Sequence, residues 1–170
     1  MTDTNYLLHT VHDLVKDPSK IEVLRLLLDK DAKQVNKVDR SGLAPIHVAA
    51  YVGNMATLKL LLSRGAEKDA RRPDGMTPML IAAFRGTSKH GDICVELAAQ
   101  GANVNVAGPM GMTVLHFLCS KGLSAPVLEL LNAQPVGANV NARTNEKSTP
   151  LHAAVSGNHL DLALTLIGQG

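Results

Sequence analysis

The chain has very little aromatic character, with two Tyr, two Phe and no Trp among its 170 residues. A core so poor in rings has to be built from Leu, Ala, Val and Ile. Short packed helices suit that composition better than a β-sandwich, in which aromatic and β-branched residues are enriched. Hydrophobic residues still make up 45% of the sequence and charged residues 19%, which predicts a folded chain. This length allows one sizeable core or one short repeat array.

Charge, cysteine and long apolar runs are also scarce. The net charge of +2 is too small to indicate nucleic-acid binding. Cys94 and Cys119 provide neither a disulfide framework nor a zinc-ligand spacing. No stretch approaches the roughly 20 apolar residues that span a bilayer, and polar residues interrupt the N-terminal segment, so a secretory signal is not expected. We expect a cytoplasmic or nuclear protein without membrane contact, metal or cofactor.

What the sequence does contain is a repeat. Four versions of one tetrapeptide start 33, 36 and 36 residues apart, namely Ala44-Pro45-Ile46-His47, Thr77-Pro78-Met79-Leu80, Thr113-Val114-Leu115-His116 and Thr149-Pro150-Leu151-His152. A glycine stands two residues before the first three versions, and Lys147 takes that place before the fourth. Each tetrapeptide is followed by small residues, a turn with Gly or Asn, and a second amphipathic segment. Gly-Ala closes the unit, with Gly170 at the corresponding position of the last one.

This pattern resembles the ankyrin-repeat family, clearly over 39–170 and as a divergent first repeat over 5–38. The resemblance implies an all-α solenoid of about five stacked helix–loop–helix units with hairpin fingers, forming a single domain over 1–170. We place the repeats at approximately 1–38, 39–71, 72–107, 108–143 and 144–170, the last one truncated. In the first repeat we predict two helices, over 5–15 and 18–29. We also expect the chain to be part of a longer protein.

Each position of the repeat has a physical role. A Thr before Pro caps a helix, and Pro suits the first helical position, while Gly or Asn supplies a left-handed turn between the two helices. The resemblance implies that His47, His116 and His152 bond backbone groups across repeats, and are therefore structural. The two longer spacings each hold three extra residues, which we place in loops over 86–91 and 132–136.

Two clusters have the residue types of a reactive or metal-binding site. His9, His12 and Asp13 offer only three ligands, and we interpret them as a solvated helix surface. His90 and Asp92 lie near Cys94, but Cys94 and Cys119 fall on apolar register positions, where a free cysteine is usually a small buried hydrophobe. No Ser–His–Asp set or phosphate-binding loop is present. The sequence therefore predicts a protein that is not an enzyme.

The resemblance places partner binding on a concave groove formed by fingertips and inner helices. By register, the partner-binding candidates are Arg40, Leu43, Tyr51, Arg72, Met76, Phe84, Arg85, Met110, Met112 and Lys121. Tyr51 and Phe84 occupy one exposed register position, and Leu43, Met76 and Met112 form an apolar stripe. Exposed apolar surface is typical of binding sites. The alternative is that these side chains cover one another and stabilise the stack.

Basic residues gather in the N-terminal half, at Lys33, Lys37, Arg40, Lys68, Arg71 and Arg72. They favour an acidic or phosphorylated partner segment, although ordinary solvation explains them equally well. We predict a protein–protein interaction scaffold that binds a protein or peptide and not nucleic acid. We expect a monomer that self-associates at high concentration.

Three further interpretations stay open. The chain is the recognition arm of a larger enzyme or channel, or it is an inhibitory ankyrin protein that retains transcription factors. Separately, Leu97 ahead of Val104-Asn105 resembles the targets of an asparagine hydroxylase, which marks Asn105 as a modification candidate. A side chain that bonds its own turn is the simpler explanation of Asn105.

Overall fold

The computed structural model describes residues 10–169, and this part of the chain is helical and contains no β-strand. The α-helices are α1 (Val11–Lys16), α2 (Ile21–Lys30), α3 (Pro45–Val52), α4 (Met55–Ser63), α5 (Pro78–Arg85), α6 (Ser88–Ala99), α7 (Val114–Ser120), α8 (Ser124–Leu131), α9 (Pro150–Ser156) and α10 (Leu160–Gln169). Short 3-10 helices cover Pro18–Lys20, Ala32–Asn36 and Pro109–Gly111. The predicted all-α fold is confirmed.

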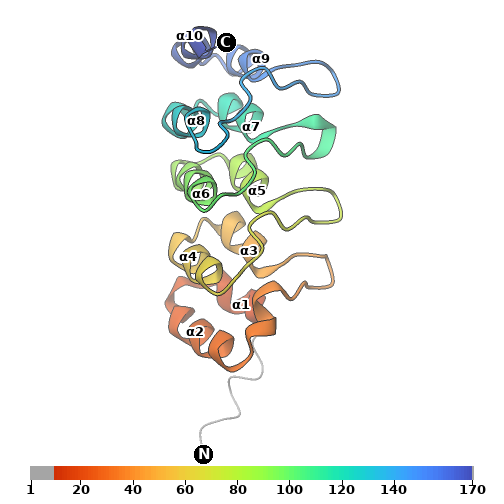
Figure 1. Cartoon of the computed structure of the whole chain (residues 1–170), viewed down its shortest axis with the longest axis vertical. Helices are drawn as coiled ribbons and strands as arrows, with labels where there is room; N and C mark the ends of the chain where they lie inside the picture. Colours follow the sequence, from red (N-terminus) through yellow and green to blue (C-terminus); the bar gives the residue numbers. More distant parts are fainter. Residues whose placement is uncertain (1–9, 170) are drawn as a thin grey trace, which may run out of the picture.

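The helices form five antiparallel pairs that stack into a rod (Figure 1). The odd-numbered inner helices form one column and the even-numbered outer helices another, and the fingers project on the side away from the outer helices (Figure 1). Each inner helix packs on the next, α1 on α3, α3 on α5, α5 on α7 and α7 on α9. The described part is therefore a quasi-one-dimensional array in which each unit packs on its immediate neighbours.

Capping residues fix where the inner helices start. Before α5, the hydroxyl of Thr77 accepts the backbone N–H of Leu80 at 3.3 Å, and Pro78 follows as the first helical residue. Before α3, Ala44 has no such hydroxyl, and Nδ1 of His47 instead accepts the Ala44 N–H at 3.0 Å. The repeat therefore keeps its helix start even where the Thr is missing.

The core runs the length of the described rod between the two helix columns. Leu58 and Leu61 of α4 are fully buried, as are Ala49 and Ala50 of α3. Small side chains on the inner helices allow the helix axes to approach closely, and the outer-helix leucines fill the space behind them. Both features agree with the predicted register.

The first repeat differs from the prediction. In the described part of the helix expected over 5–15, Thr10 is extended and caps α1 through its hydroxyl, and α1 runs from Val11 to Lys16. Residues 5–9 lie outside the described part. The second predicted helix, over 18–29, begins as a 3-10 turn at Pro18 and becomes α-helical from Ile21 to Lys30. The carboxylate of Asp17 caps that turn by accepting the N–H of Ser19.

The first of the two insertions is helical, so the predicted loop over 86–91 is wrong. Helix α6 has 12 residues against nine in α4, and it contains Ser88, His90 and Gly91. Three residues are close to one helical turn, so the extra turn keeps the apolar face of α6 on the core. The second insertion, over 132–136, does follow the outer helix α8 as a loop.

Lys147 adopts a backbone conformation that side chains disfavour. Its φ is +63°, close to the values of +74°, +83° and +77° at Gly42, Gly75 and Gly111, which hold the same place in the earlier fingers. A Cβ in the left-handed region costs about 1–2 kcal/mol. The finger geometry is therefore imposed on Lys147 by the rest of the unit.

We expect Lys147→Gly to raise the free energy of unfolding by about 0.5–1 kcal/mol, net of the extra freedom of glycine in the unfolded chain. Urea unfolding at constant m-value measures the change. The reverse substitution Gly75→Lys should destabilise the protein by a similar amount. Equal stability of all three proteins would show that these finger positions carry no strain.

Candidate functional site

The exposed side of the inner helices carries a contiguous set of aromatic and basic side chains, which we name the aromatic–basic column: Tyr51, Phe84, Arg85, Phe117 and Lys121. Tyr51 and Phe84 are 53% and 59% exposed. The guanidinium of Arg85 lies over the ring of Tyr51, 4.6 Å from its centroid. This cation–π contact links α3 to α5.

Phe84 and Phe117 continue the column from α5 to α7. Their rings meet edge to face, with centroids 5.8 Å apart and planes at 89°. Phe117 is half-buried against the core, so it supports Phe84 from below while Phe84 stays largely in solvent. A supported, exposed ring is a preorganised contact surface.

The cations of the column have no ion-pair partner within residues 10–169. Arg85 is the last residue of α5, and Lys121 caps the C-terminus of α7, so helix dipoles favour a positive charge at both places. The stem of Lys121 crosses Gly86 so closely that a Cβ there would lie 2.5 Å from its Cγ. Glycine at position 86 lets Lys121 lie beside Arg85.

The candidate residues on the fingers differ in how exposed their side chains are. Met110 is 62% exposed at a fingertip, and Arg40 is exposed on the first finger. Leu43 and Met112 are half-buried. Arg72 is also half-buried, and its guanidinium pairs with Asp74 at 3.2 Å.

The predicted exposed stripe is wrong at its centre, because Met76 is only 9% exposed. Its side chain belongs to a small apolar cluster with Leu80, Ile81 and Val106, against which Phe117 packs. The finger folds over this cluster, so the register position turns inward. Met76 therefore packs at the base of the finger and not on its exposed surface.

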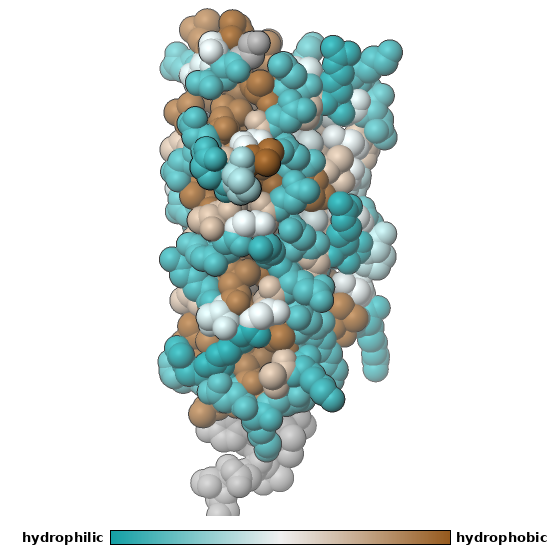
Figure 2. Space-filling view, viewed as in Figure 1, coloured by the Kyte–Doolittle hydropathy of each residue, from teal (hydrophilic) through white to brown (hydrophobic). Residues whose placement is uncertain are grey.

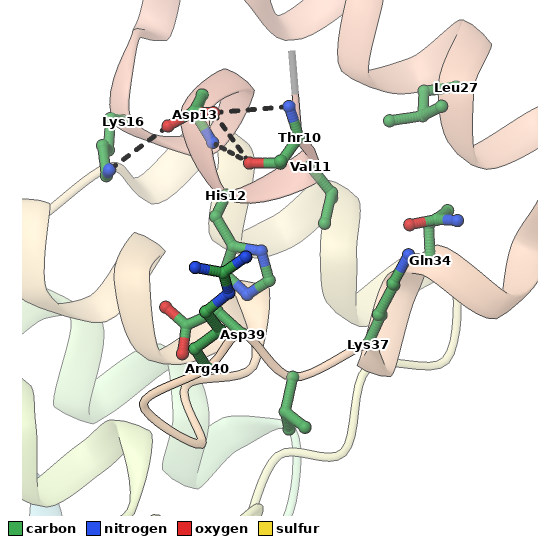
Figure 3. Close-up of a pocket in the computed structure, with 11 residues that line it drawn as sticks. Thr10, Val11, His12, Asp13, Lys16, Leu27, Gln34, Lys37, Asp39 and Arg40 are labelled. Carbon is green, nitrogen blue, oxygen red and sulfur yellow. Dashed lines mark hydrogen bonds and ion pairs between the residues drawn. The ribbon is translucent and has the colours of Figure 1, made fainter. Parts of the chain in front are cut away.

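The basic residues of the N-terminal half do not form one patch of a single sign. Lys37 and Arg40 line a hollow of about 640 Å³ at the α1 end, together with Asp13 and Asp39 (Figure 3). The N–H of Leu43 bonds the Asp39 carboxylate and lowers its pKa. Both signs of charge therefore face this hollow at neutral pH, which weakens the case for an anion site there.

Lys68 already makes a hydrogen bond within the protein. Its ammonium donates to the carbonyl of Gln100 at 2.9 Å, a contact that ties its unit to the next one.

Asn105 bonds the next unit and not its own turn. Its side-chain amide donates to the carbonyl of Gly137 at 3.1 Å, and its oxygen accepts the N–H of Asn139 at 2.7 Å. The expectation that the Asn105 side chain bonds its own turn is therefore wrong. Hydroxylation of Asn105 stays a prediction, on a side chain that is half-buried and bonded at both ends.

Histidines join the units throughout the rod. Nε2 of His47 bonds the carbonyl of Ala70 at 2.9 Å, and Nε2 of His116 bonds that of Ser148 at 3.1 Å. His90, at the start of α6, bonds back to the carbonyl of Tyr51 at 3.0 Å. All three are 1% exposed. These contacts fit the structural role predicted for His47 and His116.

Stability should therefore fall in mild acid. Burial lowers the pKa of His47, His90 and His116 below the ordinary 6.5, so the unfolded chain binds protons that the folded chain resists. The histidine contribution is complete above about pH 6.5 and is lost as the pH falls below it. Urea unfolding between about pH 7.5 and about pH 5 should show a positive slope with pH, smaller in His90→Asn. A flat profile would contradict this.

Neither cysteine is suited to nucleophilic chemistry. Cys94 and Cys119 are fully buried. Burial strongly raises the pKa of the Cys94 thiol and raises that of Cys119 to about 12, so both remain neutral thiols at physiological pH.

Two members of the first candidate metal cluster have structural roles. His12 is buried and bonds the carbonyl of Leu43, Asp13 caps α1, and His9 lies outside the described residues. Within 10–169 no group of three or more potential ligands is close enough to hold a metal. In the same range, no helix has the length and apolarity that crossing a membrane requires.

Sequence reasoning missed several residues that hold the units together. His90 and His159 share one register position and both bond a carbonyl of the preceding inner helix, Tyr51 and Ser120. Phe117 was not selected because its register position is occupied by Val48 and Ile81 in other units. The shared register of His90 and His159 becomes visible in the sequence once the three extra residues of the insertion are placed before His90.

Comparison with known proteins gives a consistent result. A family model described as ankyrin repeats (three copies) matches residues 11–107 and 80–170. A transient receptor potential cation channel subfamily A member 1 homolog of Caenorhabditis elegans is 31% identical over 140 residues, 82% of this chain and 11% of the relative. Neurogenic locus notch homolog protein 1 of Mus musculus is 30% identical over 135 residues, 78% of this chain and 5% of the relative. The chain thus spans only a small part of these relatives.

Proposed function

The chain belongs to the ankyrin-repeat family, whose repeats generally mediate protein–protein interaction, and from that premise we propose that it binds a segment of another protein across the aromatic–basic column. The observation that carries the proposal is the exposure of Tyr51 and Phe84, two of the four aromatic rings in the chain. Neighbouring positions of the same helices, such as Ala50 and Ala83, are fully buried. Tyr51 and Phe84 also contact the next inner helix, but more than half of each side chain stays in solvent, where a partner can reach it.

The charge of the column favours an acidic or phosphorylated segment. Arg85 uses the face of its guanidinium on Tyr51, which leaves its N–H edge available for a bidentate carboxylate or phosphate. Lys121 supplies a second cation on the next unit. Tyr and Arg are also the residue types that most often dominate binding energy at interfaces.

The alternative, that the chain is the recognition arm of a channel or enzyme, rests on the names of its relatives. One relative is named as a cation channel homolog and another as a notch homolog. Because the same repeat segment occurs in proteins of such different kinds, the similarity follows the scaffold and not an activity. We therefore propose non-catalytic protein binding. We also propose that the protein is a monomer located in the cytoplasm or nucleus.

The test compares capture of binding proteins by the wild-type chain and by Tyr51→Ala/Phe84→Ala, with quantitative mass spectrometry. A true partner should bind the double variant at least about 30-fold more weakly, the effect of losing a hot spot of about 2 kcal/mol. Leu26→Ala is the matched control, since Leu26 is 65% exposed on outer helix α2. Partners that bind a folded double variant as tightly as the wild type would refute the assignment.

A further inference from the structure

The aromatic–basic column repeats one combination of side chains from unit to unit. Tyr51 and Phe84 hold one register position on α3 and α5, and Arg85 and Lys121 hold the position that follows it on α5 and α7. The guanidinium of Arg85 reaches back over the ring of Tyr51, 4.6 Å from its centroid. By register, Lys121 stands to Phe84 as Arg85 does to Tyr51, and its stem crosses Gly86, two residues after Phe84. The column thus offers a ring–cation pair twice, one unit apart.

The two cations of these pairs differ from a neighbouring cation that takes part in the stack. The ammonium of Lys89 donates to the carbonyl of Val52 at 2.9 Å, which joins α6 to α3. Arg85 and Lys121 are exposed, and neither has an ion-pair partner among residues 10–169. Their charges are therefore open to an anionic ligand.

The stacking of the inner helices sets the spacing of the two ring–cation pairs. Helix α3 packs on α5, and α5 packs on α7, and the axes of packed helices lie about 8–10 Å apart. A ligand that meets both pairs in the same way has to repeat its own side chains on one face at that distance. A β-strand repeats one face at about 6.7 Å and about 13.4 Å, and an α-helix at about 6 Å and about 10.5 Å. A polyproline II segment repeats every three residues, at about 9.3 Å, which lies within the range.

Polyproline II also suits the chemistry of the column. Proline-rich segments dock on aromatic side chains and lose little conformational entropy on binding, because they are already extended when free. The exposed rings of Tyr51 and Phe84 provide such a surface, while Figure 2 shows mainly hydrophilic side chains on the visible face of the fingers. The cation of each pair then favours an acidic residue at the same three-residue period.

We propose that the column binds an acidic, proline-rich segment in the polyproline II conformation, which advances three residues for each ankyrin unit. One proline lies on Tyr51 and the next on Phe84, and acidic residues with the same spacing meet Arg85 and Lys121. The inference rests on the proposed partner site, and it specifies the conformation and the charge period of the segment that binds there.

The test titrates synthetic peptides into the isotopically labelled chain and follows the ring signals of Tyr51 and Phe84 by NMR. The probe is a peptide of repeated Pro-Glu-Ala triplets. Its control has the same composition as repeated Pro-Pro-Glu-Glu-Ala-Ala, in which no residue type recurs at a three-residue spacing. The triplet peptide should shift both ring signals and bind at least about 10-fold more tightly than the control, because it meets both pairs at once. An α-helical peptide with Glu at every seventh residue should bind no better than the control.

The charge period is tested with Lys121→Gln and the matched variant Lys30→Gln. Both remove one positive charge from an exposed position at the C-terminal end of a helix, and Lys30 lies on outer helix α2. Lys121→Gln should weaken binding of the triplet peptide about 3–5-fold, the effect of one exposed ion pair, while Lys30→Gln should leave it unchanged. Equal losses in the two variants would mean that net charge alone attracts the peptide, and the proposal would be wrong.

Equal binding of the triplet and control peptides, tighter binding of the helical peptide, or unshifted ring signals at millimolar triplet peptide would each overturn the proposal. None of these results decides the proposed function. If captured partners still depend on Tyr51 and Phe84, the column is a binding site for a segment in another conformation. If the partners bind the Tyr51→Ala/Phe84→Ala variant normally, the column itself is not the site.

Discussion

Replacing Leu58 by Ala is expected to lower the free energy of unfolding by about 3 kcal/mol. The Leu58 side chain is fully buried on α4, which packs on α2, α3 and α6. The loss combines the transfer of apolar atoms to water with the cavity left behind. The surrounding helices are held by neighbouring units on both sides, so the site cannot collapse to refill that cavity.

The matched control is Leu128→Ala on outer helix α8. Leu128 is 37% exposed and follows Val127, which holds the register position of Leu58. Its truncation should cost less than about 1 kcal/mol. Urea unfolding of the two variants measures the difference, and equal losses would mean that the buried face of the outer helices has been assigned wrongly.

The second large effect concerns His116→Ala, which should destabilise the protein by about 3 kcal/mol. The ring is 1% exposed. Its Nδ1 accepts the N–H of Thr113 at 3.2 Å, and its Nε2 donates to the carbonyl of Ser148 at 3.1 Å. The substitution leaves a cavity and removes the partners of both groups, one in its own unit and one in the next.

His152→Ala separates the contact between units from the local cap. His152 caps α9 in the same way, through Nδ1 and the N–H of Thr149, but its ring is exposed and no finger carbonyl within the described residues meets its Nε2. Its loss should cost about 1 kcal/mol, the value of a helix cap alone. Thermal and urea unfolding of both variants separate the contribution of the bond between units from that of the local helix cap. Similar losses would show that the bond to Ser148 adds nothing.

Register alone was enough to predict the exposure of Tyr51 and Phe84. Both lie one residue after an Ala pair that has to be buried for the inner helices to stack, and the helical period then turns them outward. Fingers have no such period. Met76 therefore appeared equivalent to a surface residue in the sequence, although the finger turns it onto Leu80 and Val106.

The insertion in the second full repeat shows a different limit. Gly86 and Gly91 suggested a loop, but only Gly86 has a left-handed conformation, while Gly91 lies inside α6 against Pro126. A glycine is selected there for close packing and not for a turn. Contacts of this kind, like the bond from Asn105 to Gly137, join residues more than 30 positions apart and leave no local pattern in the sequence.

Different positions of each inner helix have different roles in the rod. Buried positions such as Ala50 and Ala83 join the units, while the next position along displays Tyr51, Phe84, Ser120 and Ser156. Substitution at a displayed position changes the molecular surface by one side chain per unit and leaves the buried contacts of Ala50 and Ala83 in place. Such a chain can acquire a new ligand preference through a few point mutations at little cost in folding, which makes recognition and architecture separately evolvable.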